Sequence, residues 1–337
     1  MPLKIEVIGK TDVGLIRPGN EDYLHIDERH HVYAVCDGMG GHQAGEVASR
    51  SASKTINQIF DKWQEDVLSD AQLKFENEMP RSGELLVKSI RLANRYIYRH
   101  SSSDPGLAGM GTTIVALALE KDFVTVAHVG DSRAYRLDED AIVPLTIDHS
   151  WVAEIQQQQK LSEEDASSFV GKNIITRALG VRENVEVDYR LLKIKPGQIF
   201  LMCSDGLCGF VSNQNIYSVA SRTRKNLSRM CEDLIQLAND AGGQDNVTVV
   251  ALRVIDVEAS DKADTSTTTV AAESVDLLGA EDKWLERLDV DDPEEDTTES
   301  TDPNVTHKTG GGRGFLYFVF AAFAIIAAVI AVVYGLP

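Results

Sequence analysis

The sequence has 337 residues, of which 43% are hydrophobic and 25% are charged, and its formal net charge is −19. This length and apolar content are sufficient for one large hydrophobic core with appended segments. The acidic balance argues against nucleic acid as a partner, because nucleic-acid-binding surfaces are basic. Residues 256–302 hold 17 Asp or Glu against 3 Lys or Arg, so most of the negative charge lies in one segment.

The first hundred residues predict short strands followed by two helices. Residues 3–35 read as strands, and the apolar run 32–36 is typical of a buried strand. A helix is expected over 44–62 and a second over about 83–100. In the second, Leu86, Ile90, Ala93 and Ile97 recur at helical spacing. These apolar faces indicate packing against a common core.

Strand-like runs return in the middle of the chain. Strands over 112–119 and 123–129 flank a turn at 120–122, and a further strand is expected over 133–137. The polar segment 146–174 predicts an excursion from the sheet, with a flap at about 150–174. A strand over 199–202, a helix over about 228–239 and a strand over 247–254 complete a predicted domain at 1–255.

Two segments of different composition follow this domain. Residues 256–314 are acidic and rich in Thr and Ser, which predicts a disordered linker. Residues 315–334 carry no charge. A helix of this length spans roughly 30 Å, the thickness of the hydrocarbon core of a bilayer. Lys308 and Arg313 precede the segment, so the positive-inside rule places the domain in the cytoplasm. The sequence predicts a single-pass protein of the cell membrane.

Acidic residues follow apolar runs or lie on tight glycine turns at several places. They are Asp37, Asp131, Asp205 and Asp245, together with Glu21 and Asp22 on a loop that also carries Arg17. Carboxylates gathered at one rim repel each other unless cations neutralise them, and Mg²⁺ and Mn²⁺ prefer oxygen ligands. Two such ions can activate a water molecule, and an Arg can hold a phosphoryl group in bidentate fashion. The combination predicts metal-assisted hydrolysis of a phosphate ester.

Eight motifs appear in a characteristic order. They are RPGNED at 17–22, DGMGGH at 37–42, GMGTT at 109–113, HVGDSRAY at 128–135, LTIDHS at 145–150, ITRALG at 175–180, SDGL at 204–207 and DNVTVV at 245–250. Over about residues 5–254 the chain resembles the bacterial form of the PP2C (PPM) family of metal-dependent Ser/Thr protein phosphatases. The resemblance implies an α+β fold, a βα-sandwich of two antiparallel β-sheets flanked by helices.

The resemblance also implies a binuclear Mn²⁺ or Mg²⁺ site. Asp37 would bridge two ions, the carbonyl of Gly38 would bind one of them, and Asp205 and Asp245 would bind the other. Asp131, with Asp205, matches a weaker third-ion site of bacterial members.

Catalytic roles are implied for a second set of residues. Arg17 would bind the substrate phosphate, and Glu21 and Asp22 would orient metal-bound water. Eukaryotic members have a general-acid His at the position of Met39, so His42 is the nearest candidate proton donor in this chain.

The implied activity is that of a protein-serine/threonine phosphatase that acts on phosphorylated proteins and opposes a cognate bacterial kinase. The alternative is a membrane-tethered pseudophosphatase that binds phosphoproteins, and the full set of carboxylates argues against it. A cysteine phosphatase is excluded because no Cys is followed by Arg at the sixth position. Cys36 and Cys203 are expected in the core. A dinucleotide-binding loop is excluded because Gln43 replaces the required third glycine.

Overall fold

The computed structural model describes residues 2–40, 44–64, 79–159, 174–260 and 267–271. All of them fall within the first of two compact units, Met1–Asp291.

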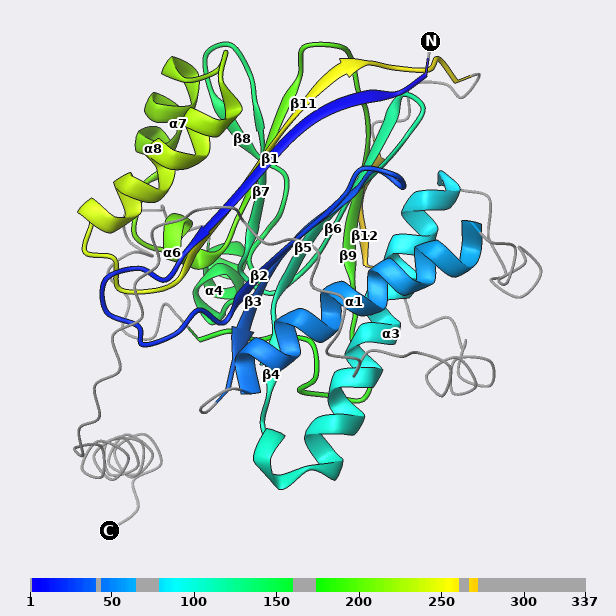
Figure 1. The fold of residues 1–337 in the computed structure, drawn as a ribbon, viewed down its shortest axis with the longest axis vertical. Coiled ribbons are helices and arrows are strands. Elements are labelled where there is room, and N and C mark those ends of the chain that lie inside the picture. Colours follow the sequence, from blue (N-terminus) through cyan, green and yellow to red (C-terminus); the bar gives the residue numbers. More distant parts are fainter. Residues whose placement is uncertain (1, 41–43, 65–78, 160–173, 261–266, 272–337) are drawn as a thin grey trace, which may run out of the picture. The chain divides into compact units, whose positions relative to one another are not determined.

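Two antiparallel sheets form the centre of the unit (Figure 1). The five-stranded sheet has the order β1-β11-β10-β7-β8, and the seven-stranded sheet has the order β12-β9-β6-β5-β3-β2, with β4 pairing β3 off that path. The strands of the first sheet are β1 (Lys4–Asp12), β7 (Arg133–Leu137), β8 (Ile142–Pro144), β10 (Ile199–Cys203) and β11 (Val247–Asp256). Those of the second are β2 (Asp22–Asp27), β3 (Val32–Met39), β4 (Gly111–Thr112), β5 (Ile114–Glu120), β6 (Phe123–Val129), β9 (Asp188–Lys193) and β12 (Thr267–Ala271).

The central strand β3 is buried on both faces, which explains its continuous apolar sequence. Successive side chains of a strand point to opposite faces. Tyr33 and Val35 pack in the core that includes Phe200 and Met202 of the other sheet. Cys36 and its alternate neighbours pack instead in the core formed with the helices. The expectation that Cys36 and Cys203 are core residues is confirmed, since both are buried free thiols.

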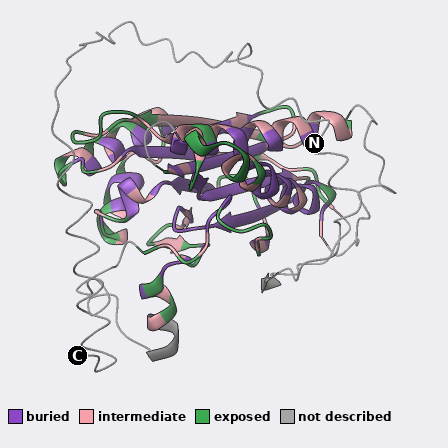
Figure 2. Ribbon diagram, turned by 90° about the horizontal axis from the view of Figure 1, so that it is seen from below, coloured by how far each residue is buried: buried purple, intermediate pink, exposed green. Residues whose placement is uncertain are grey.

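Helices cover the outer face of each sheet (Figures 1 and 2). They are α1 (Ala44–Gln64) and α3 (Arg81–Ser103) on the seven-stranded sheet, and α7 (Asn213–Arg222) and α8 (Leu227–Asp240) on the five-stranded sheet. The four apolar positions predicted for α3, from Leu86 to Ile97, are all buried. Shorter helices are η1 (Pro105–Leu107), α4 (Trp151–Gln159) and α6 (Asp205–Cys208). The predicted sandwich of two antiparallel sheets with outer helices is confirmed.

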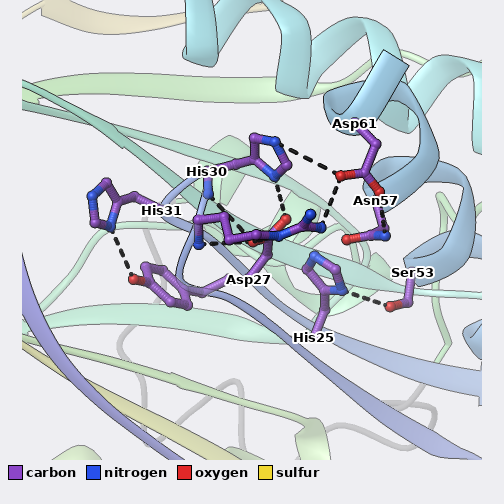
Figure 3. A network of polar contacts seen from close by, with 9 residues as sticks. His25, Asp27, His30, His31, Ser53, Asn57 and Asp61 are labelled. Atoms are coloured by element: carbon purple, nitrogen blue, oxygen red, sulfur yellow. Dashed lines mark hydrogen bonds and ion pairs between the residues drawn. The ribbon is translucent and has the colours of Figure 1, made fainter. Parts of the chain in front are cut away.

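A polar network attaches the β2–β3 hairpin to α1 (Figure 3). His30 Nδ1 lies 2.5 Å from Asp27 Oδ2, and Arg29 donates to Asp61 of α1 at 2.8 Å. Ser53, also in α1, is hydrogen-bonded to His25 Nδ1 at 2.9 Å. The network fixes the hairpin that carries three of the predicted site residues, Asp22, Asp37 and Gly38.

Several elements differ from the sequence prediction. The strand β9 and the helix α7 were not predicted, and β12 lies within the segment 256–314 that was predicted to be a linker. The helix α4 begins the predicted flap, and residues 160–173 of that flap lie outside the described part of the chain. Within the described ranges, no helix is both long enough and apolar enough to cross a membrane. The predicted spanning segment 315–334 lies outside those ranges.

Candidate metal centre

The predicted carboxylates come from both sheets. Asp22 and Asp37 are direct cross-strand partners on β2 and β3. Asp131 lies in the connection from β6 to β7, which passes from the seven-stranded to the five-stranded sheet. Asp205 begins α6 two residues after the end of β10, and Asp245 lies two residues before the start of β11. The fold therefore gathers at one end of the sandwich residues that lie up to about two hundred positions apart.

Electrostatic coupling shows that these side chains lie together. Burial, reinforced by the charges of Asp22, Asp205, Asp131 and Asp245, raises the pKa of Asp37 well above its usual range. Burial and the nearby charge of Asp205 raise the pKa of Asp131 to about 7. Burial and the charge of Asp245 raise the pKa of Asp205, and Asp37 lies within hydrogen-bonding reach of it. Ionised together, these carboxylates destabilise one another.

The donor set fits hard divalent cations. Oδ1 of Asp131 and Oδ1 of Asp205 are both buried and have no hydrogen-bond partner among the described residues. Leaving a buried polar oxygen unpaired costs about 1–3 kcal/mol, so such atoms in a native site imply a missing partner. Oxygen ligands with several negative charges suit Mg²⁺ or Mn²⁺. The arrangement therefore fits the predicted dependence on Mn²⁺ or Mg²⁺.

Arg17 lies at the accessible rim of this group. Its Nη2 lies 2.7 Å from Oδ2 of Asp245, and the two side chains are 46% and 25% exposed. Glu21 and Asp37 also contribute to the electrostatic environment of Arg17. The guanidinium is therefore close to the carboxylates and still open to solvent, as a phosphate-binding group must be.

Gly38 brings three segments into contact. A Cβ at this position would lie 2.1 Å from the Gly45 carbonyl oxygen and 2.5 Å from that of Glu21. The Gly38 amide donates to the Glu21 carbonyl at 3.1 Å. Only glycine permits this approach. The Glu21 carboxylate in turn lies against Gly45 at the start of α1. The end of β3, the loop after Arg17 and the start of α1 thus meet beside Asp37.

Two residues that support the site were not singled out from the sequence. The Asn246 side chain accepts from the Glu21 amide at 2.8 Å and donates to the Val13 and Gly19 carbonyls at 3.0 and 2.9 Å. It therefore holds the loop that carries Arg17 and Glu21 against the start of β11. Its place in the motif DNVTVV is the signal that could have identified it.

Ser204 is the second of these residues. Its hydroxyl donates to Asp22 Oδ2 at 2.8 Å and accepts from the Thr248 amide at 3.0 Å. Burial outweighs these hydrogen bonds and raises the pKa of Asp22 to about 7. Asp22 is thus anchored to the opposite sheet. His42, the candidate proton donor, lies outside the described residues.

The sequence and the fold of this chain are similar to those of known proteins. The family model described as protein phosphatase 2C matches residues 18–248. The serine/threonine phosphatase stp of Listeria innocua is 37% identical over 244 residues, which cover 72% of this chain and 92% of that protein. The crystal structure of the Mycobacterium tuberculosis serine/threonine phosphatase PstP/Ppp has a TM-score of 0.64 at 30% identity, covering 74% of this chain and 99% of that one. The PstP catalytic domain in complex with two manganese ions has a TM-score of 0.63 at 29% identity and covers 75% and 100%. This chain therefore belongs to the protein phosphatase 2C family.

Proposed function

We propose that this chain is a metal-dependent protein phosphatase that hydrolyses phosphoserine and phosphothreonine in proteins. The observation that carries the proposal is the group of buried carboxylates around Asp37, two of which have unpartnered oxygens. The relative stp is named a serine/threonine phosphatase, and the similar PstP domain is described with two manganese ions. Both support a hydrolytic role over the pseudophosphatase alternative.

The predicted ligands would hold Mn²⁺ or Mg²⁺. Asp37, Asp205 and Asp245 would bind two ions with the Gly38 carbonyl, and Asp131 would contribute to a weaker third site. When bound, the ions supply positive charge that offsets the carboxylates and activates water for attack at neutral pH.

The chain's own residues position the substrate. Arg17 would donate to two phosphoryl oxygens from the rim, for which its contact with Asp245 at 2.7 Å must loosen or be shared. Glu21, whose pKa burial raises, lies beside Arg17 and Asp245 and would orient the attacking water. Asp22, which is buried beside Asp37 and held by Ser204, would orient metal-bound water together with Glu21.

We also propose that the enzyme is tethered to the cell membrane. The uncharged segment 315–334, with Lys308 and Arg313 before it, supports a single span with the phosphatase domain in the cytoplasm. The acidic segment 256–314 would act mainly as a linker. The substrates would be phosphoproteins made by a cognate Ser/Thr kinase.

Phosphate release from a phosphothreonine peptide tests the proposed activity. The full chain is assayed with Mn²⁺, with Mg²⁺ and with EDTA, beside the variants Asp37→Ala and Asp205→Asn. Asp138→Asn is the matched control, because Asp138 pairs with Arg136 away from the site. We expect release that requires metal and falls at least about a hundredfold in both site variants.

Two results would contradict the proposal. One is release that EDTA or Asp37→Ala leaves unchanged, which would place the chemistry elsewhere. The other is a folded chain that binds the phosphopeptide and never turns it over, which would favour the pseudophosphatase.

A further inference from the structure

Two of the sequence motifs, and one residue of a third, have no role in the site described above, and the fold brings them together. They are LTIDHS at 145–150, ITRALG at 175–180 and the first residue of HVGDSRAY. His149, from the first motif, stacks on His128 with ring centroids 4.6 Å apart and an interplanar angle of 20°. Arg177, from the second motif, lies with its Nη1 3.0 Å from His149 Nε2. Asp188, at the start of β9, completes the cluster.

A metal ion is one candidate occupant of this cluster, because ligand atoms of His128, His149 and Asp188 all lie within 4.8 Å of one another. The existing contacts argue against it. Arg177 Nη1 already lies 2.7 Å from Asp188 Oδ1, so a guanidinium supplies the positive charge. His149 Nδ1 accepts from the Gly130 amide at 3.0 Å. The remaining ring proton of a neutral imidazole is then on Nε2, which faces Asp188 Oδ2 at 3.3 Å and is not free to ligate. In this tautomer Nε2 does not accept from Arg177, whose Nη1 donates instead to Asp188 Oδ1.

The contact with Gly130 is the unusual feature of the cluster. Gly130 makes two hydrogen bonds to one residue, since the His149 amide donates to its carbonyl at 2.9 Å and its own amide donates to the His149 ring. Gly130 has φ +111, and a Cβ there would lie 2.5 Å from Cβ of Thr113. The backbone of Gly130 is therefore confined by Thr113 on one side and hydrogen-bonded to His149 on the other. The next residue is Asp131.

The same histidine also begins the flap. Its carbonyl accepts from the Thr176 amide at 2.8 Å, and the Trp151 amide donates to the Ile174 carbonyl at 2.9 Å. The two chain segments that leave toward 160–173 and return from it are thus paired directly beside His149. The Arg177–Asp188 ion pair holds these two paired segments, the base of the flap, against the seven-stranded sheet.

We propose that His149 is a positioning residue that couples the base of the flap to the metal centre. By clamping Gly130 it sets the direction in which Asp131 leaves β6, and so the position of the Asp131 carboxylate. This rests on the proposed function, in which Asp131 is a ligand of the weaker third ion. Loss of the ring contact to Gly130 would weaken the binding of that ion and leave the ions on Asp37 and Asp205 bound.

Two substitutions separate the two ends of the imidazole. In His149→Asn the side-chain oxygen can replace Nδ1 as the acceptor for Gly130, and the contact with Asp188 is lost. In His149→Gln the side chain can still reach Asp188, and the acceptor for Gly130 is lost. The two variants therefore control for each other in size and polarity.

Mn²⁺ binding to the full chain is measured by paramagnetic resonance, and backbone hydrogen exchange at Gly130 is measured in the metal-free chain. We expect His149→Gln to lower the affinity for the weakest-bound ion alone, by about tenfold, and to expose the Gly130 amide to exchange. His149→Asn is expected to keep that ion within about threefold of the wild type and to keep Gly130 protected.

Equal Mn²⁺ affinities in the two variants would overturn the proposal. So would a Gly130 amide that exchanges at the rate of a solvent-exposed amide in the unsubstituted chain, a result that needs no variant to fold. Failure of the metal centre in the proposed function looks different, because the unsubstituted chain would then bind no Mn²⁺ at all.

Discussion

At the scale of single residues, the site depends on side chains that do no chemistry themselves. The Asn246 side chain makes three hydrogen bonds to backbone groups of residues 13–21. These bonds use both of its N–H groups and one of the two lone pairs of its oxygen. It is 5% exposed. Ser204 plays a comparable part for Asp22. Both connect segments distant in the sequence, so they determine whether Arg17 and the carboxylates meet.

Replacing Asn246 by Ala should therefore destabilise the chain. Three hydrogen bonds are lost, and each buried partner left unpaired costs about 1 kcal/mol or more, so we expect a loss of roughly 2–4 kcal/mol. Urea unfolding of the metal-free protein measures this change in the free energy of unfolding. Asn215→Ala is the control, because the Asn215 side chain is exposed. A loss below about 0.5 kcal/mol, the range of ordinary surface substitutions, would contradict this role.

The sequence could predict the carboxylates but not their supports. Asp37 and Asp205 each follow an apolar run and precede a glycine, and this local pattern together with the motif order was sufficient to select them. No such local sequence pattern distinguishes Asn246 and Ser204 from their neighbours. Their importance depends on partners 225 and 182 positions away, which only the folded chain brings into contact.

At the scale of elements, the β2–β3 hairpin is held to α1 by buried histidines. Burial lowers the pKa of His25 to about 4, and its Nε2 has no hydrogen-bond partner in the part of the chain that the structure describes. Outside the hairpin, burial likewise lowers the pKa of His128, on β6, to about 4. Both side chains are therefore neutral in the folded protein and become charged on unfolding below about pH 6.5.

The contribution of His25 to the stability of the fold should consequently fall in mild acid. Between pH 6.5 and 4 the unfolded chain binds more protons at His25 than the folded chain, so this histidine alone makes the free energy of unfolding rise with pH across this window. The contribution of His25 between pH 5 and pH 7 is about 2 kcal/mol. Urea titrations of the wild type and of His25→Gln should differ in their pH dependence by about this amount. Parallel pH profiles would show that His25 does not titrate as described.

Element prediction succeeded where one periodicity governs burial. The helix α3 and the strand β3 have unbroken apolar patterns because one face, or both faces, lie in a core. The strand β9 was missed because Leu191 is its only fully buried residue. The helix α7 was missed because its apolar face is limited to Ile216, Val219 and Ala220 within a polar sequence. In β12, pairing with the distant strand β9 outweighs a composition typical of disorder.

At the scale of the whole molecule, the proposed membrane tether can be tested by truncation. The full chain and a chain ending at Gly314 are produced in the same cells, and the membranes are sedimented. We expect the full chain in the membrane fraction and the shortened chain in the supernatant, because only the first contains the uncharged segment 315–334. Equal distribution of the two chains would contradict the tether and leave the phosphatase assignment unaffected.

The central claim is that folding forces acidic side chains together so that cations can bind. Asp37 is the most strongly affected of them, since burial and four neighbouring carboxylates raise its pKa. In the metal-free protein near pH 7, its charge opposes folding. With Mn²⁺ bound the same charge becomes stabilising, since a ligand at a hundred times its Kd adds about 2.7 kcal/mol.

Thermal unfolding of the wild type and of Asp37→Asn, each in EDTA and in Mn²⁺, tests this claim most directly. In EDTA we expect the variant to unfold at the higher temperature, because a repulsive charge has been removed. In Mn²⁺ we expect the order to reverse, with the wild type several degrees above the variant. An identical Mn²⁺ shift in both proteins, or no shift in either, would contradict a metal centre built on Asp37.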